Sequence, residues 1–247
     1  MAQNHKTVKI NNINYIIKNK NDIIENTLLK GVQWNNQILL LIGYWIKKYK
    51  LKHFLNVGCH IGTVALPISK YVKKVTAIEP FPPTFQHFIE HKELNDINNI
   101  ESFNLALGST EENIYFLDHE NERVKNNSGG IHVIREDDIK SDRLSSNIHS
   151  KNFKSKMIKL DNLPCEDFDI MLVDVEGYEF EVFKGGEKKI SKYRPIIIME
   201  IWGNKKRRDE NIQTSKEEVI NYISNKQYKL IKSFGDNYIF FPNHLKL

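Results

Sequence analysis

Acidic residues gather where two apolar segments of the chain end, and their side chains are the ones best suited to chemistry. Asp174 and Glu176 follow the apolar run 170–173, and Glu200 ends the apolar run 195–199. Carboxyl ends of adjacent parallel strands meet at one edge of a sheet, so we expect the three carboxylates to converge. A carboxylate so placed removes a proton from a hydroxyl group, and we predict that Asp174 or Glu176 is the general base, with Glu200 beside it.

The same three acids would also suit Mg²⁺, which prefers hard oxygen ligands. We favour proton transfer over a metal site, and loss of turnover on chelation would distinguish the two. His60 and His132 are weaker candidates for the base, because a single histidine is more often structural or on the surface.

A glycine loop is the second motif with a chemical use. The loop 58–62 reads Gly-Cys-His-Ile-Gly and follows an apolar strand, and Glu79 ends the next strand, 21 residues after Gly58. Glycine lets the backbone approach a ligand closely, and an acid at this place accepts hydrogen bonds from ribose hydroxyls. Dinucleotide loops need glycine where this chain has His60 and Thr63. The spacing therefore favours S-adenosylmethionine, which has no phosphate.

Alternating strands and helices must position these residues. Continuous apolar strands separated by helices predict a parallel sheet covered on both faces, and a final hairpin adds one antiparallel strand. The predicted strands are 53–57, 75–79, 100–104, 170–173, 195–201, 228–231 and 238–241, and the predicted helices are 63–71, 83–95, 180–190 and 215–225. The expected fold class is α/β, a Rossmann-like, seven-stranded and mostly parallel sheet.

The remaining segments are interpreted as additions to one domain. Residues 1–50 form a hairpin and two helices that pack on the core, and residues 51–247 form the main domain. The polar stretch 118–155 is an insert, read as a lid or binding loop. We expect residues 126–130 to close over the acceptor, so that deleting 120–150 harms acceptor binding more than cofactor binding.

The net charge of +5 is a lysine charge, with 30 Lys against 6 Arg, on a background of 27 Asn and 32 Ile. These residues have AT-rich codons, whereas phosphate recognition more often uses Arg. A nucleic-acid partner is therefore disfavoured, and the basic run 205–208 is read as a solvated loop. Trp34 and Trp202 are assigned to core packing, with stacking on a sugar as the alternative.

Cysteine content and hydropathy predict a cytoplasmic protein with no membrane partner. The chain has 2 Cys, no apolar run of the ~18–20 residues that span a bilayer, and no apolar signal-peptide region at its start. The sequence makes no prediction of an oligomeric state.

Taken together, the motifs resemble the FkbM-type methyltransferases, which have the class I methyltransferase fold. The resemblance covers about residues 28–202, and Asp-Val-Glu-Gly-Tyr-Glu at 174–179 followed by Lys-Gly-Gly at 184–186 is its most specific part. The other matching segments are 56–62, 77–80, 104–108 and 195–200.

This resemblance implies an O-methyltransferase that uses S-adenosylmethionine on a small-molecule or glycan hydroxyl, most often of a sugar. The basic balance of the chain would in addition help to draw in an anionic nucleotide sugar. The resemblance also implies that Gly58, Cys59, His60 and Gly62 contact the methionine side of the cofactor and that Glu79 contacts its ribose. The adenine would be contacted by Asn104, Leu105 and Ala106. Asp174 and Glu176 would face the methyl group and the acceptor. Asn56 departs from the family, which usually has Asp there to hold the cofactor's ammonium. A nucleic-acid methyltransferase and a non-catalytic cofactor-binding domain are the alternatives.

Overall fold

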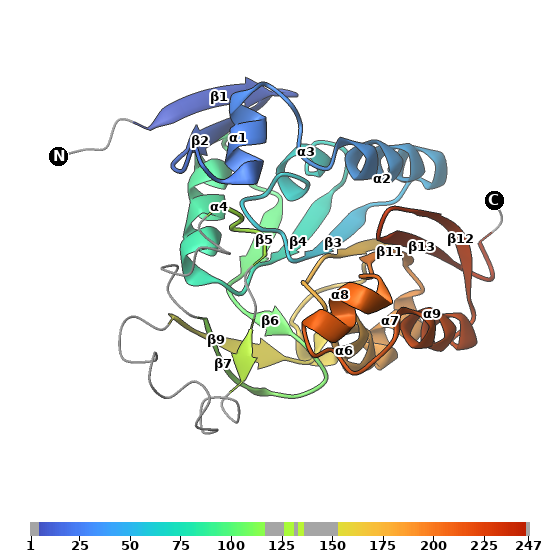
Figure 1. The fold of residues 1–247 in the computed structure, drawn as a ribbon. Helices are drawn as coiled ribbons and strands as arrows, with labels where there is room; N and C mark the ends of the chain where they lie inside the picture. The colour runs from blue at the N-terminus through green and yellow to red at the C-terminus, as the bar shows by residue number, and fades with distance from the viewer. Residues whose placement is uncertain (1–4, 117–125, 131–132, 136–152, 246–247) are drawn as a thin grey trace, which may run out of the picture.

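A seven-stranded sheet forms the centre of the computed structural model, which describes residues 5–116, 126–130, 133–135 and 153–245 (Figure 1). The spatial order of its strands is β12 (Tyr228–Phe234), β13 (Asn237–Pro242), β11 (Ile196–Glu200), β10 (Ile170–Val173), β3 (His53–Val57), β4 (Lys74–Ile78) and β5 (Ile100–Phe103). β13 is antiparallel to β11 and to β12, while the pairs from β11 to β5 are parallel. The predicted mostly parallel sheet with an antiparallel last strand is confirmed.

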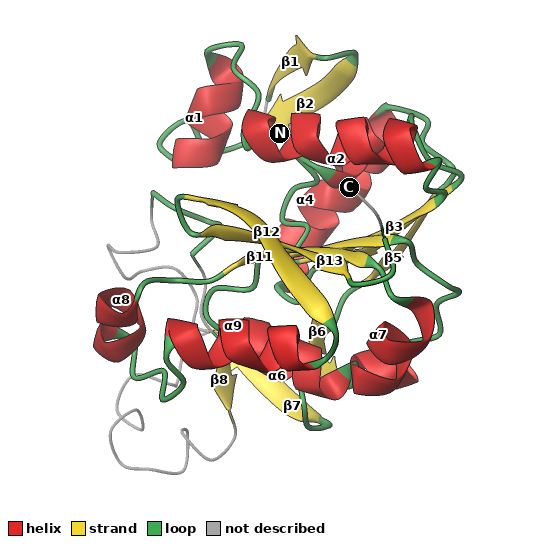
Figure 2. Ribbon diagram, turned by 90° about the vertical axis from the view of Figure 1, so that its right-hand side faces the viewer, coloured by secondary structure: helices red, strands yellow, loops and turns green. Residues whose placement is uncertain are grey.

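Helices cover both faces of this sheet (Figure 2). One core cluster joins the sheet to α2 (Asn36–Tyr49), α3 (Ala65–Ile68) and α4 (Pro82–Leu94). A second cluster, on the opposite face, joins it to α6 (Glu179–Gly185), α7 (Glu187–Tyr193) and α9 (Lys216–Asn225). The apolar strands of the sequence are thus buried on both faces, as parallel strands require.

Two helices differ from their predicted extents. The segment predicted as one helix over 180–190 forms α6 and α7, which meet at Gly186, where an added Cβ would lie 2.6 Å from Leu160. The helix predicted over 63–71 is reduced to the single turn α3. At Gly186 the chain packs closely against Leu160, and the break between α6 and α7 falls at this contact.

A second, small sheet was not predicted. Its strand order is β6 (Ala106–Leu107), β9 (Phe153–Ile158), β7 (Glu112–Phe116) and β8 (Ile134–Arg135). A one-turn helix at Leu160–Asn162 follows β9. The insert read at 118–155 thus starts next to β7 and ends inside β9, but most of it, including His132, lies outside the described residues.

The N-terminal segment packs against the same core as the sheet. It consists of β1 (Lys6–Ile10), β2 (Ile13–Ile17) and α1 (Ile23–Leu29), followed by α2. Ile13, Leu28 and Ile42 from these elements are fully buried in the first core cluster. Within the described residues, no helix is both long and apolar enough to cross a membrane.

Two buried histidines attach β2 to α4. His91 Nε2 accepts the N–H of Ile16 at 2.9 Å, and its Nδ1 lies 2.9 Å from the carbonyl oxygen of Ile61. His87 Nε2 lies 2.9 Å from the carbonyl oxygen of Ile16. Burial lowers the pKa of His87 from 6.5 to about 3, and it also lowers the pKa of His91. The hairpin is therefore held by imidazole rings in their neutral form.

We expect acid to destabilise the protein through His87. Its pKa is lower in the folded chain than in the unfolded chain, so its contribution is complete above pH 6.5 and is lost as the pH falls toward 3. His87→Gln keeps a side-chain N–H for Ile16 but does not titrate. Between pH 6 and pH 4, the wild-type free energy of unfolding should fall more steeply than that of the variant, by up to about 1.4 kcal/mol per pH unit. Urea denaturation at several pH values measures this, and parallel curves would contradict it.

Candidate functional site

A cavity of about 570 Å³ opens at the carboxyl ends of β3, β4, β10 and β11. Its lining combines the loops that follow these strands with residues from the start of α1, from the segment just before α2 and from the small second sheet. Residues 127–129 and residues 206–212 complete it. A cavity of this size suits a cofactor together with a small acceptor. Segments that are distant from one another in the sequence therefore line the same cavity.

The glycine loop is packed directly against the acidic loop. Gly58 has φ +78°, and a Cβ added there would lie 1.8 Å from the carbonyl oxygen of Asp174. Gly62, with φ +89°, faces the ring of Phe88, which an added Cβ would approach to 2.6 Å. Gly58 thus permits contact between two loops of the site, and Gly62 permits packing of the loop on α4.

Glu79 lies at the end of β4 and organises the glycine loop. Its carboxylate accepts the backbone N–H of His60 at 2.9 Å and that of Phe81 at 3.0 Å. The side chain is 7% exposed, and this burial raises the pKa of Glu79 to about 7. Glu79 lines the cavity, as an acid that binds ribose hydroxyls would.

His60 follows in the same loop and is held by a residue distant in sequence. Its Nε2 lies 2.9 Å from Ser128 Oγ, while its Nδ1 is buried without a hydrogen-bond partner among the described residues. Burial lowers the pKa of His60 to about 4, so the ring is neutral at physiological pH. The burial of Cys59 raises the pKa of its thiol well above the ordinary value, which argues against a reactive thiolate.

Asn56, the residue that departs from the family pattern, lies on β3 with its side chain buried in the cavity wall. The residue is 1% exposed, and neither its amide oxygen nor its amide nitrogen has a hydrogen-bond partner within the described part of the chain. An unpaired buried polar group costs about 1–3 kcal/mol. Such a pair of atoms fits a polar ligand that carries both a hydrogen-bond donor and an acceptor.

The residues expected near adenine have different positions. Ala106 lines the cavity, whereas Asn104 and Leu105 are not part of its described lining. Gly62, which was expected at the methionine side of the cofactor, is not part of that lining either. Asn104 donates its side-chain amide to the carbonyl oxygens of Glu79 (2.9 Å) and Pro80 (3.1 Å), which fixes the turn after β4.

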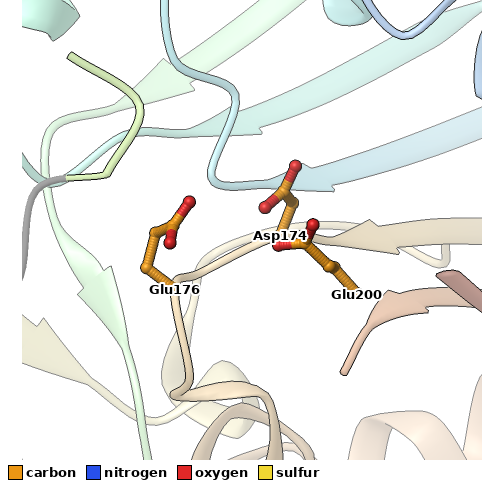
Figure 3. Close-up of side chains that lie close together, drawn as sticks. All are labelled: Asp174, Glu176 and Glu200. Carbon is orange, nitrogen blue, oxygen red and sulfur yellow. The ribbon is translucent and has the colours of Figure 1, made fainter. Parts of the chain in front are cut away.

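The three acids of the predicted catalytic group lie together (Figure 3). Asp174 follows β10, Glu200 ends β11, and Glu176 reaches toward them from the loop after β10. Each has a carboxylate oxygen within 4.8 Å of those of the other two. Glu176 has φ +52°, a left-handed conformation that turns the loop back toward the cavity.

Crowding of these carboxyl groups changes their acidity. Burial, together with the charges of Glu200 and Glu176, raises the pKa of Asp174 well above its ordinary value. Burial and Glu200 raise the pKa of Glu176 to about 7, against the opposing effect of the Lys206 ammonium. Three oxygen ligands in this arrangement could hold Mg²⁺, or they could share protons and exchange them with a substrate.

Two features of the acceptor side were not predicted. Lys206 Nζ lies 3.9 Å from Glu176 Oε2 and 3.4 Å from the ring centre of Trp202. Trp202 is 1% exposed and its Nε1 donates to Glu200 Oε2 at 3.3 Å, so it packs in the core and also positions an acid. Trp34, by contrast, lines the cavity.

Three of residues 205–208 are exposed, as expected, but the segment is not a loop. They lie in α8 (Asn204–Asp209), and Arg207 is 1% exposed. Its Nη1 lies 3.5 Å from Glu179 Oε2, and its Nε donates to the carbonyl oxygen of Thr214 at 2.6 Å. The buried guanidinium pairs with a carboxylate 28 residues away, and no local pattern in the sequence predicts that pair.

A family model of the FkbM methyltransferase domain matches residues 56–230. None of the curated proteins compared matches the sequence.

Several solved structures are similar at low identity. The methyltransferase FkbM from Methylobacillus flagellatus KT has 15% identity and a TM-score of 0.49, covering 77% of this chain and 43% of its own. A putative O-methyltransferase from Klebsiella pneumoniae has 13% identity and a TM-score of 0.48, covering 89% and 87%. The N-methyltransferase NodS from Bradyrhizobium japonicum WM9 has 11% identity and a TM-score of 0.49, covering 83% and 90%. This chain thus spans less than half the length of the Methylobacillus protein.

The sheet order, the glycine loop and the family match define the class as S-adenosylmethionine-dependent methyltransferase. Because the family model covers most of its length, the chain belongs to the FkbM methyltransferase family.

We expect Asn56→Leu to weaken cofactor binding without destabilising the protein. Leucine has nearly the same shape and removes two unpaired polar atoms, so the melting temperature of the ligand-free protein should stay equal or rise. The dissociation constants of S-adenosylmethionine and S-adenosylhomocysteine should increase about tenfold, equivalent to about 1.4 kcal/mol. Calorimetry measures both constants, and unchanged affinity would show that Asn56 does not contact the cofactor.

Proposed function

We propose that this protein transfers a methyl group from S-adenosylmethionine to a hydroxyl oxygen of a small molecule or glycan, with a sugar as the favoured acceptor. The observation that carries the proposal is the convergence of Asp174, Glu176 and Glu200 in the lining of a cavity whose other half we assign to the cofactor. An alcohol is a poor nucleophile while protonated, and this arrangement offers it a base.

The cofactor half of the cavity is assigned to the residues around the glycine loop. Asn56 and His60 offer unpaired polar atoms to the methionine end, and Glu79 is placed for the ribose hydroxyls. S-adenosylmethionine supplies a methyl group that is already an activated electrophile. The protein's main task is then to hold the acceptor oxygen in line with it.

Glu176 is the proposed base. Its pKa of about 7 leaves a large ionised fraction at neutral pH, and the ammonium of Lys206 favours that form. The carboxylate takes the hydroxyl proton as the oxygen–carbon bond forms, and later releases it to solvent. Asp174, with its raised pKa, serves as a hydrogen-bond donor to the acceptor, and Glu200 holds the acceptor from the Trp202 side.

The charges of the cavity favour a neutral acceptor. Its described lining carries the carboxyl groups of Glu79, Asp174, Glu176, Glu200 and Glu210, against one ammonium, that of Lys206. These acids would repel the backbone of a nucleic acid and the diphosphate of a nucleotide sugar. Sugar hydroxyls donate hydrogen bonds to carboxylates, and the ring of Trp34 offers an apolar wall.

We expect Glu176→Gln to lower kcat by about 10²–10⁴-fold, because glutamine cannot accept the proton. Affinity for S-adenosylhomocysteine should change less than about threefold, since the base faces the acceptor. A screen of methyl transfer to neutral glycans and to nucleotide sugars, with radioactive S-adenosylmethionine, measures the first effect and calorimetry the second.

Asp174→Asn tests the neighbouring acid in the same assay and should lower kcat less than Glu176→Gln does. The matched control is Glu166→Gln, the same change at a side chain that is 80% exposed. A larger loss in Asp174→Asn than in Glu176→Gln would move the role of base to Asp174. Equal activity of all three variants would contradict the proposal.

We further propose that turnover needs no divalent metal, because Lys206 and Trp202 already interact with two of the three carboxylates. Dialysis against EDTA should therefore leave kcat within about twofold of its starting value. If turnover is lost and Mg²⁺ restores it, then Asp174, Glu176 and Glu200 are metal ligands and the role of base passes to another group.

A further inference from the structure

A short segment from the insert lies against the N-terminal part of the chain. The backbone N–H of Ser128 donates to Asp22 Oδ2 at 2.6 Å, and the N–H of Ile23 donates to the carbonyl oxygen of Asn126 at 2.9 Å. A Cβ added at Gly129 would lie 3.1 Å from the side chain of Ile24. We refer to residues 126–130 as the strap.

Asp22 performs two tasks at this contact. It is 1% exposed and is the N-cap of α1, where its Oδ1 accepts the N–H groups of Ile24 and Glu25, both at 2.9 Å. Its other oxygen, Oδ2, holds the strap through Ser128. One carboxylate therefore fixes the start of α1 with one oxygen and the strap with the other.

The strap reaches the glycine loop through a single side chain. Ser128 Oγ lies 2.9 Å from His60 Nε2, and His60 in turn donates its backbone N–H to Glu79. A neutral imidazole has one donor and one acceptor nitrogen. A serine hydroxyl can donate or accept, so the bond to Ser128 fixes the orientation of the ring in either tautomer, while Nδ1 is buried without a partner among the described residues.

The position of these residues assigns the strap to the cofactor half of the cavity. Asn127, Ser128 and Gly129 line it together with His60 and Glu79. The acids of the acceptor half have no hydrogen bond to the strap among the described residues. Asp22 also precedes residues 56–230, so this support comes from outside the part matched by the family model.

We propose that Asp22 is a positioning residue for S-adenosylmethionine: it holds the strap so that Ser128 fixes the His60 ring in the wall of the cofactor half of the cavity. This inference rests on S-adenosylmethionine as the ligand of the cavity. It replaces the expectation that residues 126–130 close over the acceptor.

The decisive variant is Asp22→Asn. Asparagine is as good an N-cap as aspartate, so α1 keeps its cap, but an amide nitrogen in place of Oδ2 cannot accept the N–H of Ser128. Ser128→Ala removes the bond to His60 and leaves the backbone contact to Asp22. Ser128→Thr keeps the hydroxyl and serves as the conservative control.

Calorimetry with S-adenosylhomocysteine on the full-length protein is the measurement, beginning with the wild type. Asp22→Asn and Ser128→Ala should each raise the dissociation constant about tenfold. The double variant should bind S-adenosylhomocysteine no more weakly than the weaker-binding single variant. Ser128→Thr should bind it like the wild type. Melting temperatures should agree within a few degrees, which separates a positioning effect from unfolding. At saturating S-adenosylmethionine, the KM of an acceptor should be unchanged.

Two outcomes would overturn the inference. Wild-type affinity in both Asp22→Asn and Ser128→Ala would show that the strap does not act on the cofactor. A raised acceptor KM with unchanged cofactor affinity would assign the strap to the acceptor. Failure of the wild type to bind S-adenosylhomocysteine is a different result, since it would remove the proposed function itself.

Discussion

The contact between the backbone of Gly58 and that of Asp174 is the constraint on which the site depends. β3 and β10 are neighbours, and the N–H of Asp174 donates to the carbonyl oxygen of Val57 at 3.0 Å, which continues the pairing of the strands into the loops. At 1.8 Å from the carbonyl oxygen of Asp174, even one methyl group on residue 58 would force the loops apart. The cofactor loop and the acidic loop are therefore positioned as one unit.

The negative charges of the acidic side chains beside this contact are offset by positive charges from an element outside the sheet. α8 does this with two adjacent cations, since Lys206 lies near Glu176 and the buried Arg207 pairs with Glu179. A buried ion pair adds little net stability, but removal of one partner leaves an uncompensated charge. Arg207 thus fixes α8 next to the acidic loop, and that placement brings Lys206 to the proposed base.

Long apolar strands and the two loop motifs were predictable because their signals are local. The pattern Gly-Cys-His-Ile-Gly with Glu79 at the next strand end, and the acids from 174 to 200, were placed from spacing alone. β6 and β8 have two residues each, too few to show a periodicity. The pairing of Asp22 with Ser128 spans 106 residues, and that of Arg207 with Glu179 spans 28, so no local pattern predicts them.

The neutral side chain at position 56 is consistent with the charge of the rest of the cavity. The pKa values of Asp174 and Glu176 are already raised by burial and by neighbouring acids, and that of Glu79 by burial. A further buried carboxylate on β3 would raise them again and would itself tend to be protonated. Asn56 instead offers a donor and an acceptor without adding charge. The acids that remain still attract a sulfonium cation more strongly than the neutral thioether left after methyl transfer, which favours exchange of product for fresh donor.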